Sequence, residues 1–391
     1  MSEADTVTLA NGNYTMAGNI TTDMMNGTNN DSSWSNETIL YIAEDSRLKQ
    51  FGIWYQGIHG YVSIVVCVFG IVSNIMNIMV LTQRNMVTPT NYLLTALAIA
   101  DMLTMTSYLP FAVYFYCVTE LDYEYNHPQG WIVYLIFNTN FIITCHTIAM
   151  WLTVSLAVFR YIVVCHHTLG PKLCNLYRAK ITIIAVFVTT VLFCIPNYVM
   201  YKPVLNKGTT GGYWFTWNTF IKEFHKIFNF WLFGVVIKVA PCVLLTVLSS
   251  LLIHAMRLAE KKRQRLKSQG KRAESERTSE HNRTTAMLVA VVLCFVIAEL
   301  PQGILAFLSG VDNDIFYNVY IPLGDVWDIL VLVNSAVNFV LYCIMSRQFR
   351  STFKEVFLVY CLKPKHKTPN GVQYSTIETQ ATKYSTTDTK L

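Results

Sequence analysis

The chain has 391 residues and a net charge of +6, but only 14% of its residues are charged and its mean hydropathy is +0.35. Soluble domains carry about a quarter charged residues, so this composition excludes an ordinary soluble protein and gives no indication of a nucleic-acid partner. The apolar residues instead form blocks of twenty or more, each long enough to cross a hydrocarbon core of about 30 Å as a helix.

These blocks predict an all-α membrane protein, a seven-transmembrane helix bundle, because a span in lipid must satisfy its own backbone hydrogen bonds. The alternating pattern of a membrane barrel is absent from the sequence. The spans define a transmembrane domain over residues 59–345. They are predicted at 60–82, 91–116, 132–164, 179–201, 227–256, 285–309 and 321–345.

Residues 1–58 are predicted to form a flexible extracellular tail. The first fifty residues contain no apolar run, so we expect no cleavable signal peptide and a first span that acts as its own insertion signal. Asn-x-Ser/Thr motifs are glycan acceptors only in the secretory lumen, although a merely disordered polar tail would also be rich in Asn and Thr. The tail has five such motifs, at Asn13, Asn19, Asn26, Asn30 and Asn36.

Basic residues are distributed unevenly between the two sides of the predicted bundle. With the N-terminus outside, the external segments hold six Lys and Arg, whereas the internal loop 257–284 alone holds ten, against four Glu. The positive-inside rule therefore predicts a plasma-membrane protein with its N-terminus outside. The basic loop either binds anionic lipid or extends the flanking helices toward a cytoplasmic partner.

The predicted external side has little cysteine. Only Cys117 lies at an external helix end, so no disulfide is expected between the external loops. The second external loop, 202–226, is long and carries the aromatic run 213–217.

A short amphipathic helix is predicted after the last span, over residues 346–361. Phe349, Phe353 and Phe357 recur there at helical spacing with basic residues between them, which is typical of a helix lying on a membrane surface. Cys361 at its end is a candidate palmitoylation site.

Residues 362–391 are predicted to form a disordered cytoplasmic tail rich in Ser and Thr. The chain ends in Thr389, Lys390 and Leu391, a sequence that can add as a strand to a PDZ domain.

Polar residues within the predicted spans mark candidate functional sites, because polar groups are costly inside a bilayer. They include Gly70-Ile-Val-Ser-Asn74, Leu97-Ala-Ile-Ala-Asp101, Phe159-Arg160-Tyr161 and Asn334-Ser335-Ala-Val-Asn338-Phe-Val-Leu-Tyr342, with Pro110, Pro241 and Pro301 in spans 2, 5 and 6. In this order the motifs resemble those of the rhodopsin-like (class A) G-protein-coupled receptors across all seven spans.

The resemblance implies an extracellular ligand, a heterotrimeric G protein activated through outward movement of span 6, and arrestin and receptor kinases acting at the Ser/Thr-rich tail. It gives Arg160, Tyr161 and Tyr342 roles in G-protein activation. It also implies a buried polar cluster that either holds a sodium ion or is a hydrogen-bonded network without one; Ala149, where relatives carry a hydroxyl, disfavours sodium. The cluster comprises Asp101, Asn74, Asn334, Ser335 and Asn338.

Three departures from the family pattern are informative. Phe159 replaces the usual carboxylate, so Arg160 lacks its neighbouring ion-pair partner; Phe339 replaces the usual proline of span 7, which removes the reason for a kink. Glu299 stands where a tryptophan usually precedes the proline of span 6. The segments Glu299-Leu-Pro-Gln-Gly and Trp151-Leu-Thr-Val resemble the invertebrate receptors for myosuppressin and FMRFamide-type peptides, with sex-peptide and myoinhibitory-peptide receptors as near relatives.

That subfamily resemblance implies a short amidated peptide carrying a guanidinium and an aromatic ring. A carboxylate in a pocket of low dielectric suits a guanidinium, through a charge-assisted hydrogen bond. Glu299 pairs either with the peptide or with Lys238 of span 5, since opposite charges at similar depth most simply pair with each other. If Lys238 holds Glu299, Asp325 or Asp328 is the better partner for the peptide.

Aromatic residues are candidates to receive the ring of the peptide. Trp327 and Trp231 lie in the external half of the predicted bundle. His146 either lines the floor of the pocket or is a core residue with its hydrogen bonds satisfied.

Other functions of a seven-helix protein fit less well. A hydrolase would need clustered His and Asp for a metal, but His146 is the only His well inside a predicted span, so neither an enzyme nor a metal site is expected. A light-driven pigment needs a lysine within 321–345, a transporter needs internal repeats, and an amine receptor needs an Asp where Ile142 stands. The open alternative is a small-molecule chemoreceptor of the same class.

Overall fold

The structure is a computed structural model that describes residues 47–119, 126–166, 168–205, 211–218, 239–269, 272–309 and 313–359. The chain divides into two units, Met1–Thr352 and Phe353–Leu391. In the second unit the described residues are Phe353 and a π-helix, η5, Lys354–Val359, and the rings of Phe353 and Phe357 lie 4.7 Å apart. The first unit contains the helix bundle and both strands.

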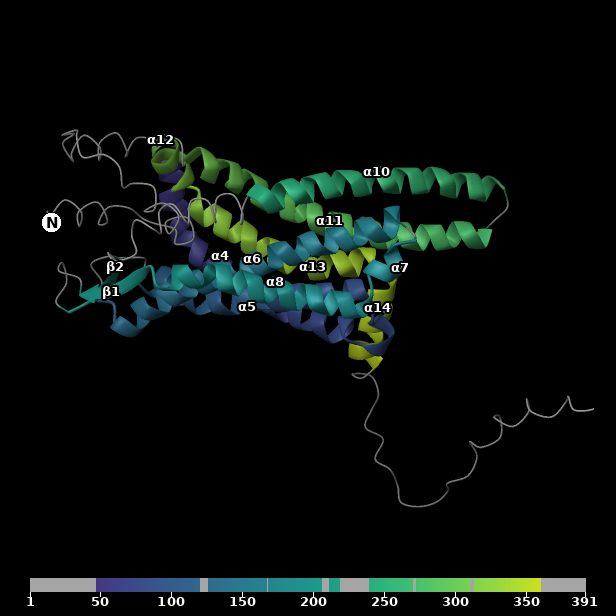
Figure 1. Ribbon diagram of the computed structural model, residues 1–391. Helices are drawn as coiled ribbons and strands as arrows, with labels where there is room; N and C mark the ends of the chain where they lie inside the picture. The colour runs from purple at the N-terminus through teal and green to yellow at the C-terminus, as the bar shows by residue number, and fades with distance from the viewer. Residues whose placement is uncertain are drawn as a thin grey trace, which may run out of the picture. The chain divides into compact units, whose positions relative to one another are not determined.

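Seven helices in the described part of the chain are long and apolar enough to cross a membrane, which confirms the predicted fold class. α4 packs against α5 and α13, α6 packs against α5, α8 and α10, and α11 packs against α10 and α13, so the helices close into a ring (Figure 1). Their bounds are α4 Arg47–Leu81, α5 Pro89–Phe111, α6 Gln129–Cys165, α8 Leu176–Tyr198, α10 Ala240–Ser268, α11 Arg272–Ser309 and α13 Gly324–Met345.

Several helices extend beyond the apolar blocks that predicted them. α4 begins at Arg47, so residues 47–58, which were assigned to the tail, are helical. α10 continues to Ser268 and α11 begins at Arg272, so most of the basic 257–284 loop is also helical. Hydropathy marks only the stretch that lies in hydrocarbon, whereas a helix continues wherever its backbone hydrogen bonds are satisfied.

Two strands follow α8 within the predicted second external loop, which the sequence did not indicate. β1, Tyr201–Leu205, pairs antiparallel with β2, Tyr213–Trp217. The aromatic and β-branched residues of these segments favour the pleated conformation. We refer to the two strands as the β-pair, and to the end of the bundle at which they lie as the β-pair end (Figure 1).

Non-covalent contacts attach the β-pair to the start of α6. The N–H of Tyr213 donates a hydrogen bond to the carbonyl of His127 at 2.9 Å, and the rings of His127 and Trp214 lie 5.5 Å apart. All cysteines of the described residues, Cys117 among them, are free thiols. Aromatic packing and backbone pairing therefore hold this segment in place.

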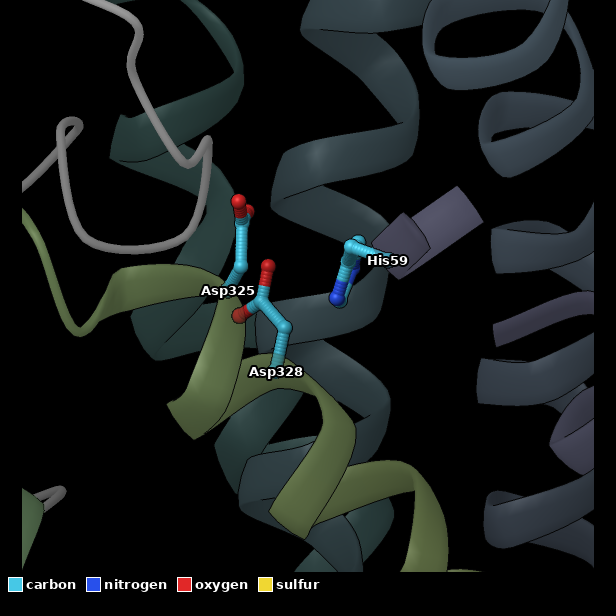
Figure 2. Close-up of side chains that lie close together, drawn as sticks. All are labelled: His59, Asp325 and Asp328. Atoms are coloured by element: carbon cyan, nitrogen blue, oxygen red, sulfur yellow. The ribbon is translucent and has the colours of Figure 1, made fainter. Parts of the chain in front are cut away.

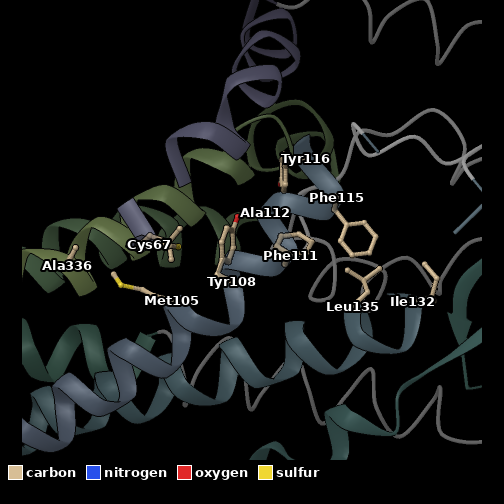
Figure 3. Packing of buried hydrophobic residues seen from close by; sticks show 11 residues of the cluster. Cys67, Met105, Tyr108, Phe111, Ala112, Phe115, Tyr116, Ile132, Leu135 and Ala336 are labelled. Carbon is tan, nitrogen blue, oxygen red and sulfur yellow. The ribbon is translucent and has the colours of Figure 1, made fainter. Parts of the chain in front are cut away.

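A proline near the end of α5 changes the course of the second span. Pro110 cannot donate a backbone hydrogen bond, and after Phe111 the chain continues as a π-helix, η2, Ala112–Val118. A π-helix is wider than an α-helix and commonly occurs at functional sites. It directs Phe115 and Tyr116 into the core at the β-pair end, where they pack with residues of α4, α5, α6 and α13 (Figure 3).

The last helix of the first unit, α14, is tied to the end of α13. Arg350 donates through Nη1 to the carbonyls of Cys343 at 2.9 Å and Ile344 at 2.7 Å, groups that a helix C-terminus leaves without partners. The ring of Phe349 packs 5.6 Å from that of Tyr342. The remaining short elements are η1 Arg84–Met86, α7 Gly170–Leu173, α12 Asn313–Ile315, η4 Phe316–Tyr320 and α14 Arg347–Phe353.

Several predicted residues lie outside the described part of the chain. They are Asn13, Asn19, Asn26, Asn30, Asn36, Trp231, Lys238, Cys361, Thr389, Lys390 and Leu391, and their roles stay predictions.

We expect Gly60→Ala to lower the thermal stability of the purified protein. An added Cβ would lie 2.5 Å from the Cβ of Tyr116 and 2.9 Å from Sγ of Cys117, so α4 and η2 would have to move apart, and overpacking of this kind costs about 1–3 kcal/mol. Gly57 is the matched control, because an added Cβ there meets nothing within 4 Å and Ala is favoured over Gly inside a helix by roughly 0.5–1 kcal/mol. Thermal unfolding in detergent should therefore rank Gly57→Ala highest and Gly60→Ala lowest; an unchanged midpoint for Gly60→Ala would contradict this packing.

Candidate functional site

Two carboxylates and a histidine lie together at the β-pair end of the bundle, between α4 and α13 (Figure 2). One oxygen of Asp325, one of Asp328 and one ring nitrogen of His59 all lie within 4.8 Å of one another. All three side chains are buried, with exposed fractions of 4%, 8% and 0% respectively. We refer to these three residues, together with the hydroxyl groups of Tyr108 and Tyr116, as the acidic cluster.

Hydroxyl groups supply the observed hydrogen bonds of the acidic cluster. The hydroxyl of Tyr116 donates to Oδ1 of Asp325 at 2.6 Å, and that of Tyr108 makes a long hydrogen bond of 3.5 Å to Oδ2 of Asp328. Nε2 of His59 lies 2.8 Å from the Tyr108 hydroxyl. Tyrosines of the second span therefore connect the histidine of α4 with the carboxylates of α13.

Local structure explains why these side chains meet. Asp325 and Asp328 are three residues apart, so they lie on the same face of the first turns of α13. Gly60 lets α4 approach η2 closely, which brings its neighbour His59 beside Tyr116, with ring centroids 4.7 Å apart. Tyr116 reaches the cluster because the π-helix after Pro110 turns it inward.

Burial of the two carboxylates gives the acidic cluster its chemical character. Charged groups are rarely buried unless they pair with an opposite charge or a metal, and two carboxylates close together disfavour each other's ionisation. A ligand that brings positive charge relieves both costs. The cluster is therefore suited to bind a cation at the β-pair end of the bundle.

Trp327 lies between the two acids in sequence and is also buried, with 8% of its surface exposed. Its indole Nε1 has no hydrogen-bond partner in the structure. An unpaired buried donor costs about 1–3 kcal/mol, so this N–H is available to a ligand carbonyl. The role of Trp327 in ligand binding stays a prediction.

Glu299 has a partner that the sequence did not predict. Its Oε1 lies 3.1 Å from Nε2 of His146 on α6, although the orientation is not that of a hydrogen bond, and Glu299 is fully buried. The His146 ring stacks on Phe295 with centroids 5.8 Å apart. The pair joins α6 to α11, whereas Lys238 lies outside the described residues and its pairing with Glu299 stays a prediction.

The predicted polar cluster is brought together in the middle of the bundle. Nδ2 of Asn338 donates to Oδ2 of Asp101 at 3.0 Å, and Nδ2 of Asn74 donates to the carbonyls of Gly70 and Ser335, at 2.9 Å and 3.1 Å. These contacts link the helices α4, α5 and α13. Asn334 is buried beside them in sequence on α13.

The predicted activation residues lie at the end of the bundle opposite the β-pair. Arg160 is buried, and its Nε has no hydrogen-bond partner. Among the described residues, no carboxylate forms an ion pair with it. Tyr342 is buried, and Tyr161 is half-buried with its ring 5.7 Å from His166.

Comparison with known proteins agrees with this arrangement. The profile of the family described as "Serpentine type 7TM GPCR chemoreceptor Srw" matches residues 61–360, most of the chain. The chain belongs to this family of seven-helix G-protein-coupled receptors. The receptor is therefore a multi-pass protein of the plasma membrane and is not an enzyme.

The receptor is similar to several invertebrate receptors. It is 32% identical over 384 residues to the G-protein coupled receptor dmsr-1 of Caenorhabditis elegans, covering 83% of this chain and 73% of that protein. It is 31% identical over 349 residues to the sex peptide receptor of Drosophila melanogaster, covering 85% and 79%. The Drosophila FMRFamide receptor is 28% identical over 309 residues, covering 75% and 52%. The predicted resemblance to this group of receptors is confirmed.

Sequence reasoning missed three members of the acidic cluster of this receptor: His59, Tyr108 and Tyr116. The statement that His146 is the only His well inside a span was wrong, because α4 begins earlier than its apolar block and includes the fully buried His59. The first span was predicted to start at residue 60, which left this histidine outside. Extending the predicted helix by a single residue would have included it.

We expect His146→Gln and Glu299→Gln to be coupled in thermal stability. Either change leaves one polar partner of a buried contact behind, so the double variant should lose less stability than the two single losses together, by about 0.5–3 kcal/mol. Thermal unfolding of the four purified receptors completes the cycle. The control is Glu299→Gln combined with the distant Gly57→Ala, whose effects on stability should simply add. If the stability losses of His146→Gln and Glu299→Gln also add strictly, the two side chains are not in direct contact.

Proposed function

We propose that this receptor is activated by an extracellular short peptide whose basic group binds the acidic cluster. The observation that carries the proposal is the burial of Asp325 and Asp328 together at one end of the bundle, with tyrosine hydroxyls as hydrogen-bond donors. A guanidinium supplies both positive charge and several donors, and its charge-assisted hydrogen bonds to carboxylates are about twice as strong as neutral ones. The names of the similar receptors, for sex peptide and FMRFamide, support a peptide as the ligand class.

An amidated peptide of the FMRFamide or myosuppressin type matches the chemistry of this region. Its arginine fits Asp325 or Asp328, and its uncharged C-terminus avoids adding a negative charge near them. Trp327 offers a buried ring and an unpaired N–H for the aromatic residue and backbone of the peptide. Trp231 stays a candidate for the same role.

The orientation follows from charge and from the position of the acidic cluster. We place the N-terminus and the β-pair end outside the cell, because the basic residues gather at the ends of α10 and α11 that lie away from the β-pair, as the positive-inside rule requires for the cytoplasmic side. The acidic cluster then faces the extracellular ligand, and Arg160 faces the cytoplasm. The Asn-x-Ser/Thr motifs of the tail support this orientation, because such motifs accept glycans only in the secretory lumen.

Signalling requires the ligand end to influence the Arg160 end. We propose that α11 swings outward at its cytoplasmic side and lets a heterotrimeric G protein contact Arg160, Tyr161 and Tyr342. The His146–Glu299 contact joins α6 to α11, so a ligand that changes it would change the packing of the helix that moves. A sodium ion at Asp101, arrestin and kinases at the Ser/Thr-rich tail, and a PDZ partner at Leu391 are further proposals of the same scheme.

A small-molecule chemoreceptor is the second candidate, because the matching family profile is described as one of chemoreceptors. Screening cells that express the receptor against amidated peptides and against small odorant-like molecules separates the two. Activation by small molecules alone, with every peptide silent, would favour the chemoreceptor.

For an activating peptide from that screen, we expect Asp325→Asn or Asp328→Asn to lower potency by roughly 10- to 100-fold. Losing a hydrogen bond to a charged group costs about 1.5–3 kcal/mol, whereas asparagine keeps the size and much of the hydrogen-bonding capacity of the side chain. The measurement is a concentration–response curve for G-protein activation, with surface expression as a reference. Asp314→Asn is the matched control, because Asp314 is an exposed acid on α12.

A neutral peptide analogue makes this test specific. Replacing the peptide arginine with citrulline should lower the potency of the peptide at the wild-type receptor. At the variant whose missing carboxylate normally binds the arginine, the same replacement should lower potency little further. Equal losses in all receptors would mean that the arginine binds elsewhere.

We expect Phe159→Glu to reduce the basal signalling of the receptor by a few fold. Arg160 has no ion-pair partner among the described residues, so a carboxylate beside it would provide one and would stabilise the inactive state. Phe159→Gln is the uncharged control of the same length. Basal activity is measured with a panel of G-protein dissociation sensors, and a Glu variant no quieter than the Gln variant would refute the role of this charge pair.

A further inference from the structure

The acidic cluster has the composition of a metal site as well as that of an anionic binding site. An imidazole and two carboxylates converge from two helices, His59 from α4 and the acids from α13, with their nearest ligand atoms within 4.8 Å of one another. Figure 2 shows His59 facing the carboxylate of Asp328 across the gap between the helices, with Asp325 one turn away. Metal–ligand bonds to zinc are about 2.0–2.2 Å for nitrogen and oxygen, so modest side-chain rotations suffice to bring all three onto one ion.

The hydrogen bonding of His59 provides a second, independent observation. This side chain is fully buried, yet its Nδ1 has no hydrogen-bond partner. Its Nε2 lies near two hydroxyl groups, 2.8 Å from Tyr108 and 3.1 Å from Ser63. A histidine that binds a metal through one nitrogen needs a polar partner for the other, and His59 has one nitrogen with such partners and one without any.

A neutral imidazole carries one proton on its two nitrogens, and only an unprotonated nitrogen binds a metal. Nε2 is the nitrogen within hydrogen-bond distance of the Tyr108 hydroxyl, at 2.8 Å. With the proton on Nε2 and donated to Tyr108, Nδ1 is unprotonated, and the imidazole is then in a tautomer that can bind a metal.

We propose that His59, Asp325 and Asp328 bind a divalent transition-metal ion of the zinc type. The two negative charges of the carboxylates balance the charge of a dication, and a neutral imidazole adds a third ligand without adding charge. Imidazole favours zinc and its neighbours, whereas Ca²⁺ and Mg²⁺ prefer sites made of oxygen ligands. Three protein ligands leave the fourth position of a tetrahedral ion for a water molecule.

The ion would have a definite mechanical effect on the bundle. It joins the first and last spans at the β-pair end, where α4 and α13 already pack against each other. It also occupies the carboxylates that the proposed peptide needs, so metal and peptide exclude each other there. The metal proposal itself does not depend on the identity of the ligand.

The test is a titration of the purified full-length receptor with Zn²⁺ alone, by equilibrium dialysis with elemental analysis and by thermal unfolding. We expect wild-type receptor and Asp314→Asn to bind one tight equivalent of Zn²⁺ and to unfold at higher temperature with it, and excess Ca²⁺ or Mg²⁺ not to displace it. His59→Ala, Asp325→Asn and Asp328→Asn should each weaken this binding by on the order of tenfold or more.

Two outcomes would overturn the proposal. One is the absence of tight Zn²⁺ binding to the wild-type receptor; the other is Zn²⁺ binding by the three site variants that is as tight as that of the wild type and of Asp314→Asn. The two Asn variants keep the shape of the aspartates and can still accept the tyrosine hydrogen bonds, so they report on the site even if His59→Ala does not fold. Because no peptide is present, a negative result leaves the proposed peptide function untouched.

Discussion

A bilayer contains no water to hydrogen-bond the polar groups of a spanning helix, and this constraint governs the structure of the receptor. A polar side chain in a spanning helix can bond a carbonyl of its own helix, as Thr104 and Thr153 do; otherwise it finds a partner on another helix or bears the cost of having none. Three such contacts follow one another along α13. Asp325 and Asp328 accept hydrogen bonds from tyrosine hydroxyls, and Asn338 donates to Asp101. Near the end of the helix, the ring of Tyr342 packs on Phe349. The contacts that stabilise the bundle therefore lie along a single helix, α13, from the acidic cluster through the centre to the end opposite the β-pair.

The acidic cluster depends on departures from ideal helix geometry elsewhere. Pro110 ends the regular hydrogen bonding of α5, and the π-helix that follows directs Tyr116 toward Asp325. Gly60 allows α4 to lie directly against that π-helix and so brings His59 into the cluster. Nearby, the β-pair is held to α6 by the Tyr213 hydrogen bond and aromatic stacking. Local irregularities of the second span thus bring the acidic cluster together among otherwise apolar helices.

The sequence predicted the fold well, because a run of about twenty apolar residues has few structural alternatives in lipid. It also identified Asp325, Asp328 and Glu299 as acids in a costly environment. It could not identify their partners, since those depend on how each helix is rotated and on where it truly begins. His59 lay just outside the predicted first span, and Tyr108 and Tyr116 looked like ordinary apolar residues of the second. The contact between Glu299 and His146 likewise follows from the relative rotation of α6 and α11, which hydropathy does not encode.

We propose that the buried acids at the start of α13 receive the positive charge of the ligand. An electron cryo-microscopy structure of the receptor with an activating peptide and a G protein would show whether they do. We expect the basic side chain of the peptide within hydrogen-bonding distance of Asp325 or Asp328, with Trp327 against the peptide and Arg160 facing the G protein. A peptide bound with its basic group away from both carboxylates, and with the acidic cluster unchanged, would refute the proposal.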